Sequence, residues 1–307
     1  MASLIRCGTA GWSYPHWNTA VYPKPKPRGF HPLEYLSRYF DTLEINSTFY
    51  RPVRPEISRL WAAMVSSNPQ FRFTAKLARR FTHERELETR EVGAFKDGLW
   101  PLWKAGRLGC LLMQFPWSFR YTVENREFFI RLRRTFHEFP LVAEMRHESW
   151  MREEALGTFI DYRVGFCNID QPRFEKSMPP TAFLTSAIGY VRLHGRTDAP
   201  GAAEMEGAAS ACNNYLYSEK ELAEWEVRIR SIGALADSTY VITTNDASGK
   251  AVVNALQLQT MLGTRAAKAP HELMRRHRAA LAGFANSGPL QDTLFPDLAA
   301  SSGRAVA

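Results

Sequence analysis

Two glutamates, Glu44 and Glu144, are the side chains in this sequence that best suit acid–base chemistry. Each ends a short apolar segment, which is where α/β barrel enzymes carry their reactive groups. Paired carboxylates that flank a bond can donate and accept protons during glycoside or phosphodiester cleavage. The alternative is structural, with each glutamate balancing a cation: Glu44 with Lys76, and Glu144 with Arg146 or Arg192.

Four basic side chains occupy similar positions at or near the ends of apolar segments, namely Lys76, Arg146, Arg192 and His194. Guanidinium groups bind phosphate and carboxylate through paired hydrogen bonds, so this set favours an anionic substrate. The two glutamates alone carry too little negative charge to balance it. Asp170 and Asp246 could instead complete an internal ring of salt bridges. We also place His194 with the two glutamates among the candidate catalytic residues.

The other candidate substrate-binding residues are polar or aromatic: Asn46, His83, Gln114, His147, Trp150, Asp170, Asn245 and Asp246. The histidines and carboxylates among the candidates could bind a divalent metal such as zinc or manganese. No HExxH or similar local spacing occurs, so the sequence leaves a metal open. It also lacks a GKS/T phosphate loop, a GxGxxG fingerprint and a nucleophile elbow. Their lack disfavours nucleotide triphosphate hydrolysis, dinucleotide redox chemistry and α/β-hydrolase chemistry.

Short apolar segments, typical of strands buried on both faces, position these side chains. Eight strands are expected, at Leu4–Cys7, Thr42–Ile45, Phe71–Ala75, Cys110–Gln114, Leu141–Glu144, Val164–Ile169, Tyr190–Leu193 and Tyr240–Thr244. Helical patterns lie between them, at Pro32–Phe40, Pro55–Ser66, Val92–Lys104, Glu124–Glu138, Arg152–Tyr162, Ser218–Leu235 and Gly249–Leu262. Pro32 and Pro55 suit first helical positions, and Ser218 followed by Glu221 fits a capping box.

Strand and helix alternate about eight times, which predicts a single-domain α/β fold, the closed TIM-type (β/α)8 barrel. A doubly wound open sheet is the second choice. The barrel is expected over residues 1–263, a basic C-terminal helix over 264–286 (formed by Ala269–Phe284) and a flexible tail over 287–307. The sixth unit is the weakest, because residues 171–186 show no helical register. The long segment Arg196–Leu216 is expected to cover the barrel mouth as a lid.

The composition excludes several classes of protein. With 307 residues, 45% hydrophobic and 23% charged, the chain is not disordered, collagen-like or disulfide-dense. No apolar run approaches the roughly 20 residues that a membrane helix needs, and the N-terminus shows no secretory signal. The four cysteines form no CxxC pair and are expected to be buried and reduced in a cytoplasmic protein. The net charge of +8 fits a phosphate-bearing or nucleic-acid partner, or simply a basic surface.

The C-terminal segment contains a candidate partner-binding peptide, Gln291-Asp292-Thr293-Leu294-Phe295. It resembles the QxxLF peptide by which bacterial DNA-maintenance proteins bind the replication sliding clamp. In such a complex Leu294 and Phe295 would fill an apolar pocket while Gln291 forms hydrogen bonds. The alternative is that Leu294 and Phe295 pack back onto the barrel.

Seven motifs occur in order along the chain: GTAGW at 8–12, EINSTFYR at 44–51, KxxRxxTH at 76–83, QFP at 114–116, EMRHESW at 144–150, VRLHG at 191–195 and YSEKELAEW at 217–225. Together they resemble the domain-of-unknown-function-72 (YecE-like) family from roughly Ile5 to Leu262. The resemblance implies a TIM-type barrel and no settled reaction. The eighth strand departs from the family pattern: it ends in Thr243-Thr244-Asn245-Asp246 where a Phe-Asn-Asn-Asp run is expected. Only Asn245 and Asp246 match.

Three functions remain open from the sequence. The first is a barrel enzyme that acts on an anionic substrate, phosphorylated or derived from nucleic acid, by acid–base chemistry at the C-terminal mouth of the barrel. The second is a nucleic-acid-binding or repair-accessory module that the QxxLF-like peptide recruits to the clamp. The third is a glycoside hydrolase, which requires the two glutamates to face each other across the substrate.

Overall fold

Eight parallel strands close into a barrel in this computed structural model, which describes residues 4–196, 214–265 and 268–287. The strands pair in chain order, and the last pairs with the first in a register that sets Leu4 beside Ser238 and Thr9 beside Thr243. Their bounds are β1 Leu4–Ala10, β2 Thr42–Ile45, β3 Arg72–Lys76, β4 Leu108–Gln114, β5 Leu141–Glu144, β6 Gly165–Asp170, β7 Ile188–Leu193 and β8 Ser238–Thr243. The predicted single-domain TIM-type barrel is confirmed, and the open sheet is excluded.

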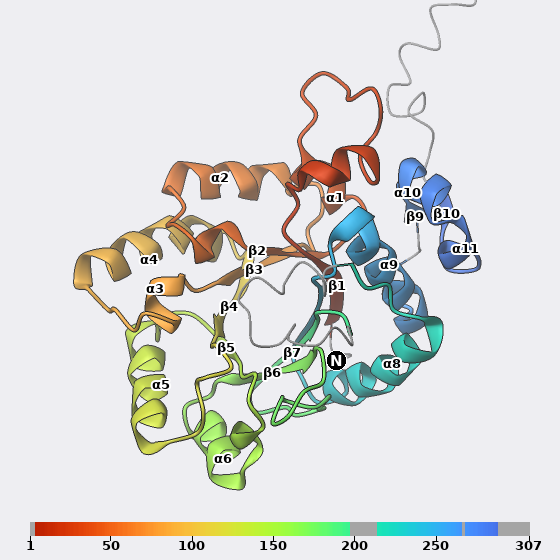
Figure 1. Cartoon of the computed structure of the whole chain (residues 1–307). Coiled ribbons are helices and arrows are strands. Elements are labelled where there is room, and N and C mark those ends of the chain that lie inside the picture. Colours follow the sequence, from red (N-terminus) through yellow and green to blue (C-terminus); the bar gives the residue numbers. More distant parts are fainter. Residues whose placement is uncertain (1–3, 197–213, 266–267, 288–307) are drawn as a thin grey trace, which may run out of the picture.

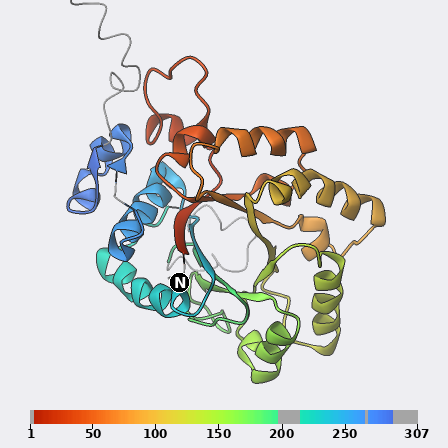
Figure 2. The ribbon, with the colours of Figure 1, turned by 180° about the vertical axis from the view of Figure 1, so that it is seen from behind.

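The α-helices form a ring around the barrel, as Figures 1 and 2 show from opposite sides. They are α1 Pro32–Ser37, α2 Pro55–Met64, α3 Arg79–Thr82, α4 Thr89–Lys104, α5 Val123–Thr135, α6 Glu153–Asp161, α8 Glu219–Gly233 and α9 Lys250–Leu262. Short 3-10 helices follow four of the strands: η1 Pro15–Thr19, η2 Ser47–Phe49, η3 Glu148–Met151 and η4 Ala247–Gly249. These 3-10 helices lie after the carboxyl ends of strands, so they border the barrel mouth.

The predicted helix starts are confirmed at residue level. Pro32 and Pro55 occupy the first turns of α1 and α2, where a missing N–H leaves no hydrogen bond unmade. The Ser218 side chain accepts from the Glu221 backbone, and the Glu221 side chain accepts from the Ser218 backbone. This reciprocal capping box fixes where α8 begins.

The sixth unit has no helix between β6 and β7: the described residues 171–187 form an irregular loop. The buried side chain of Asn168 holds this loop in place. Its Oδ1 accepts from the Phe183 backbone at 2.7 Å and from the Thr181 hydroxyl at 2.8 Å, and its Nδ2 donates to the Phe183 carbonyl at 2.9 Å. Side-chain hydrogen bonds therefore replace a helix as the means of closing this unit.

The C-terminal segment corrects one prediction. Instead of a single helix over Ala269–Phe284, it forms α10 (His271–Arg276) and α11 (Arg278–Leu281), beside α9 in Figure 1. The break falls at His277, whose backbone leaves the helical region and whose Nε2 lies 2.9 Å from the Ser248 carbonyl. Nearby, Gln257 Nε2 donates to the Ala280 carbonyl at 2.8 Å. Tertiary hydrogen bonds thus override the helical periodicity.

Aromatic and polar side chains fill the barrel interior below the mouth. Tyr240 from β8 passes Gly109 on β4, where an added Cβ would lie 2.1 Å from the tyrosine hydroxyl. The Tyr190 ring, from the neighbouring strand β7, lies beside the Tyr240 ring, with ring centres 6.0 Å apart. The glycine is therefore required by close approach, and the interior is a packed core rather than a pore.

A matched pair of glycines in α4 tests the packing of the outer layer. A Cβ at Gly98 would lie 2.1 Å from the Val53 carbonyl, whereas a Cβ at Gly93 would meet nothing within 4 Å. We expect Gly98→Ala to lower the free energy of unfolding by about 1–3 kcal/mol through overpacking. Gly93→Ala should raise it by about 0.5–1 kcal/mol, because alanine favours helix. Urea denaturation of both variants measures this, and equal effects would contradict the close contact.

Candidate functional site

Arg192 stands at the centre of the candidate site and binds two buried glutamates through one guanidinium group. Its Nη2 donates to Glu44 Oε1 at 2.9 Å, and its Nη1 donates to Glu144 Oε2 and, at 2.9 Å, to Gln114 Oε1. Both carboxylates are fully buried, and Arg192 is 3% exposed. Since β2, β5 and β7 are not neighbours in the barrel, these contacts run across its interior.

Glu44 has its second oxygen bonded as well. Tyr190, two residues before Arg192 on β7 and so on the same face, donates from its hydroxyl to Glu44 Oε2 at 2.9 Å. The Tyr190 hydroxyl also lies 2.8 Å from Thr74 Oγ1 on β3. Glu44 is therefore held from both sides, by a cation towards the mouth and by a phenol from below.

Arg146 and His194 contact Glu144 at its other oxygen. Arg146 donates to Glu144 Oε1 from Nε and Nη2, both at 3.0 Å, and His194 Nε2 lies 3.2 Å from the same atom. Burial alone raises the pKa of Glu144, but Arg192, His194 and Arg146 together hold that pKa well below its ordinary value. Glu144 is thus a fixed carboxylate at neutral pH.

His194 lies between Glu144 and the hydroxyl of Thr244. The Thr244 hydroxyl donates to the Leu193 carbonyl at 3.2 Å and lies 3.0 Å from His194 Nδ1, while His194 Nε2 faces Glu144. Nε2 is buried and makes no well-aligned hydrogen bond with any described residue. Burial, against the opposing charge of Glu144 and together with the charge of Arg192, lowers the pKa of His194 to about 4, so the ring is neutral at pH 7.

Lys76 is the third cation of the cluster and the least satisfied. It ends β3, is half-buried, and its Nζ lies 4.4 Å from the centre of the Phe49 ring. No carboxylate in the described part of the chain forms an ion pair with it. Burial and the charge of Arg192 lower the pKa of Lys76 to about 8, against the opposing charges of Glu44 and Glu144.

Three more predicted residues lie at the rim of this cluster. Asn46 contacts the Tyr14 hydroxyl, which donates to the Ala10 carbonyl at 2.6 Å, and Asn46 Oδ1 is buried without a hydrogen bond to any described residue. His83 packs edge-on against the Phe49 ring at 5.3 Å. Asp246 Oδ2 lies 3.2 Å from His16 Nε2. With Gln114, these side chains border the mouth.

Four predicted substrate-binding residues point elsewhere. Asp170 accepts from Arg196 and from the Trp225 indole of α8, and Asn245 donates to Asn254 of α9, so both face the outer helices. Trp150 is fully buried in the outer core, with its indole N–H donating to the Phe119 carbonyl at 2.7 Å. His147 Nδ1 accepts from the Ser149 backbone at 3.1 Å and its ring packs against Trp117, beside the mouth rather than in it.

The predicted site residues do not include Tyr190, Thr244 or Phe49, which the structure places in contact with the site. Tyr190 and Thr244 each carry a signal, because they share the two-residue period of Arg192 and Tyr240 on their strands and so face inwards. Phe49 lies in η2 and contacts Lys76 through the loop that follows β2. No strand period applies to such a loop.

Several predictions fall outside what the structure describes. Most of the expected lid (Arg196–Leu216) and the tail residues Gln291, Leu294 and Phe295 lie in segments that are not described. Within the described residues, no group of three His, Cys, Asp or Glu side chains converges as a metal site would require. Nor does that part of the chain contain a helix with the length and hydrophobicity needed to cross a bilayer.

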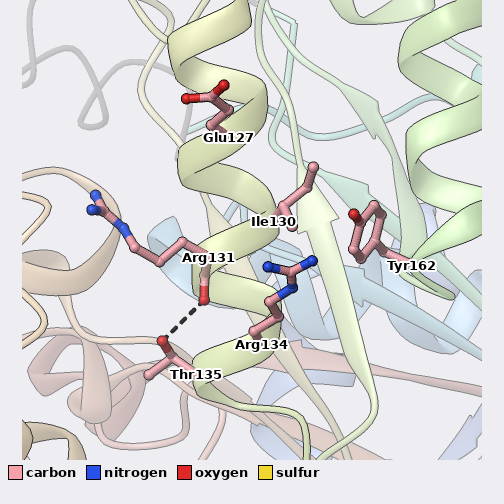
Figure 3. A pocket seen from close by; sticks show the side chains of 6 residues that line it. All are labelled: Glu127, Ile130, Arg131, Arg134, Thr135 and Tyr162. Atoms are coloured by element: carbon pink, nitrogen blue, oxygen red, sulfur yellow. Dashed lines mark hydrogen bonds between the residues drawn. The ribbon is translucent and has the colours of Figure 1, made fainter.

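A separate hollow lies on the outside of the barrel, between α5 and the end of α6. It has a volume of about 580 Å³ and is lined by Glu127, Ile130, Arg131, Arg134, Thr135 and Tyr162 (Figure 3). None of the predicted site residues lines it. The cluster around Arg192 at the barrel mouth, rather than this hollow, is therefore the candidate functional site.

Comparison with known proteins supports the barrel and leaves the reaction open. A family described as "Protein of unknown function DUF72" matches residues 6–278. The UPF0759 protein YecE of Escherichia coli K12 is 29% identical over 118 residues, which are 38% of this chain and 39% of YecE. The chain therefore matches about two-fifths of that curated relative.

Two solved structures share the architecture. A DUF72 family protein from Thermotoga maritima MSB8 is 29% identical, with a TM-score of 0.71 and coverage of 85% of this chain and 99% of that one. A DUF72 family protein from Enterococcus faecalis V583 is 23% identical, with a TM-score of 0.74 and coverage of 85% and 96%. At that lower identity the similarity concerns the fold alone.

Replacement of Arg192 by an uncharged residue should destabilise the fold. Arg192→Met leaves Glu44 and Glu144 buried without their shared partner, which we expect to lower the free energy of unfolding by about 3–5 kcal/mol. The control is Arg38→Met, which breaks an exposed pair with Glu34 and should cost at most about 1 kcal/mol. Guanidinium denaturation measures both variants. Similar costs would contradict the central role of Arg192.

The ionisation of His194 gives a pH prediction. The imidazole should titrate with a pKa of about 4 instead of the ordinary histidine pKa of 6.5. The ring should therefore be neutral above about pH 4 and protonated below it. Glu144 favours the protonated ring, so Glu144→Gln should lower the midpoint further. NMR titration of the imidazole measures both, and a wild-type midpoint between 6 and 7 would show that the ring is solvated.

Proposed function

Since this chain belongs to the DUF72 family of proteins of unknown function, the family supplies no reaction, and we propose from the site that the protein is an enzyme acting on an anionic substrate. The substrate is phosphorylated or derived from nucleic acid, and it reacts by acid–base chemistry at the C-terminal mouth of the barrel.

The charge balance of the cluster carries this proposal. Glu44 and Glu144 supply two negative charges, whereas Arg192, Arg146 and Lys76 supply three positive ones. His194 adds none, because its low pKa keeps it neutral at pH 7. An unpaired charge is costly in such a buried setting. An anionic group on the substrate would balance the surplus.

The three cations of the cluster differ in how well they could bind an anion. Arg192 is buried and already donates to three acceptors, so it positions the glutamates rather than the substrate. Arg146 keeps 32% of its side chain exposed, and Lys76 has no carboxylate partner among the described residues. Lys76 and Arg146 therefore form the anion-binding pair, and partly exposed Gln114 lies beside them.

The proton-transfer role falls to His194. Glu144 has a strongly lowered pKa and hydrogen bonds at both oxygens, so it is a poor general acid or base near pH 7. His194 is neutral at pH 7, so one of its two ring nitrogens carries a lone pair that can accept a proton. Glu144 would then stabilise the imidazolium that forms.

The alternatives receive less support. Glycoside hydrolysis needs one carboxylic acid with a raised pKa, whereas Glu144 has the opposite shift and Glu44 is bound to Arg192 and Tyr190. Recruitment to the sliding clamp through Gln291, Leu294 and Phe295 remains a prediction from the sequence. A steep loss of nucleic-acid affinity with salt would favour the binding module.

Two measurements test the proposal. Inorganic phosphate, titrated calorimetrically at pH 7, should bind the wild type at least tenfold more tightly than Lys76→Met, and the exposed control Lys104→Met should bind like the wild type. With p-nitrophenyl phosphate and bis(p-nitrophenyl) phosphate as probes, His194→Asn should lower turnover by about 10²–10⁴-fold. The exposed control His137→Asn should not. Equal phosphate affinity in wild type and Lys76→Met would overturn the anion site.

A further inference from the structure

We propose that Lys76 is a nucleophile that condenses with a carbonyl group of the substrate to form an imine, so that the substrate is an anionic aldehyde or ketone. The anionic part of this statement rests on the proposed function above. The carbonyl part rests on the surroundings of Lys76 and is tested separately.

Lys76 lies where a substrate at the mouth can reach it. It stands two residues after Thr74 on β3, and Thr74 bonds to Tyr190 inside the barrel, so both side chains share the inner face. Lys76 is the last residue of its strand, at the end of the barrel that holds active sites in this fold. Its side chain is half-buried rather than sealed in the core.

Burial and the neighbouring arginines favour the free amine of Lys76 over the ammonium. Arg192 on β7 and Arg146, just after β5, repel a positive charge there, while Glu44 on β2 and Glu144 on β5 attract it. Both carboxylates are already bonded to arginines, and neither forms an ion pair with Lys76. The remaining described contact is the cation–π contact with the Phe49 ring, which holds Nζ over the ring face. Partial burial beside other cations is the setting that activates lysine as a nucleophile.

The consequence for reactivity is large. With a pKa of about 8, about a tenth of Lys76 is the free amine at pH 7, against about one in three thousand for a lysine with a pKa of 10.5. The fraction of nucleophile therefore rises by a factor of about 300. Lys104 is the natural comparison, because it also lies over an aromatic ring, that of Trp100 at 5.8 Å, but is exposed.

The condensation balances without an oxidant or a reductant. The amine of Lys76 attacks the carbonyl carbon, a C–N bond forms and the carbonyl π bond opens to a carbinolamine. Loss of the hydroxyl group as water then gives the protonated imine. In total, one ammonium and one carbonyl become one iminium and one water, with the two protons lost by nitrogen leaving in the water. The iminium keeps the positive charge that Glu44 and Glu144 attract.

The first experiment uses the full-length wild-type protein. Pyridoxal 5′-phosphate serves as the probe because it joins an aldehyde to a phosphate, and sodium borohydride reduces any imine to a stable amine. Peptide mass spectrometry then locates the label. We expect Lys76 to be labelled at least tenfold faster than Lys104, with a rate that rises between pH 7 and pH 9 and saturates with probe. No label should appear at position 76 in Lys76→Arg.

A second probe separates the two proposals. Pyridoxal, which lacks the phosphate, should label Lys76 more slowly than the phosphorylated probe, and inorganic phosphate should compete only with the latter. Equal labelling of Lys76 by both probes would retain the imine and overturn the anion site. Labelling of Lys76 no faster than that of Lys104 by either probe would overturn the imine, whatever the phosphate affinity. Because the label is located in unaltered protein, misfolding of a variant cannot produce either result.

Discussion

One guanidinium group, that of Arg192, joins opposite sides of the barrel interior. It binds Glu44 from one strand and Glu144 from another, and each carboxylate then positions further groups, Tyr190 below and Arg146 and His194 above. Buried charges are tolerated only when paired and hydrogen-bonded, so each member of this network depends on the others. The same pairs that hold the barrel together therefore fix the electrostatics of its mouth.

The barrel itself was predictable from the sequence, because strands buried on both faces form continuous apolar runs, and eight such runs alternate with helical patterns. That same continuity hides the two-residue alternation that decides which side chains face inwards. Asp170 and Asn245 were expected at the mouth for this reason, yet they face α8 and α9. Thr244, one residue before Asn245, is the residue that reaches His194.

Strand periodicity could not predict the residues of the site that lie outside the strands. Trp150 lies beyond the end of its strand, in η3, where packing among the outer aromatic rings decides its place. Phe49 contacts Lys76 only because η2 folds back over the end of β2. The sequence placed four basic side chains beside Glu44 and Glu144 and left open whether Asp170 and Asp246 balance them. Which of these cations lacks a carboxylate partner among the described residues depends on three-dimensional distances, and it is Lys76.

The loop that replaces the sixth helix has a bearing on how this barrel can diversify. A helix fixes the length and direction of a connection, whereas residues 171–187 are closed by side-chain hydrogen bonds to Asn168 and so tolerate insertion at small entropic cost. Gln171 at the start of the loop donates to the backbone carbonyl of Arg146 at 3.1 Å. Evolutionary change in this loop would therefore shift Arg146, the residue that we propose as an anion contact, while the eight strands stay as they are.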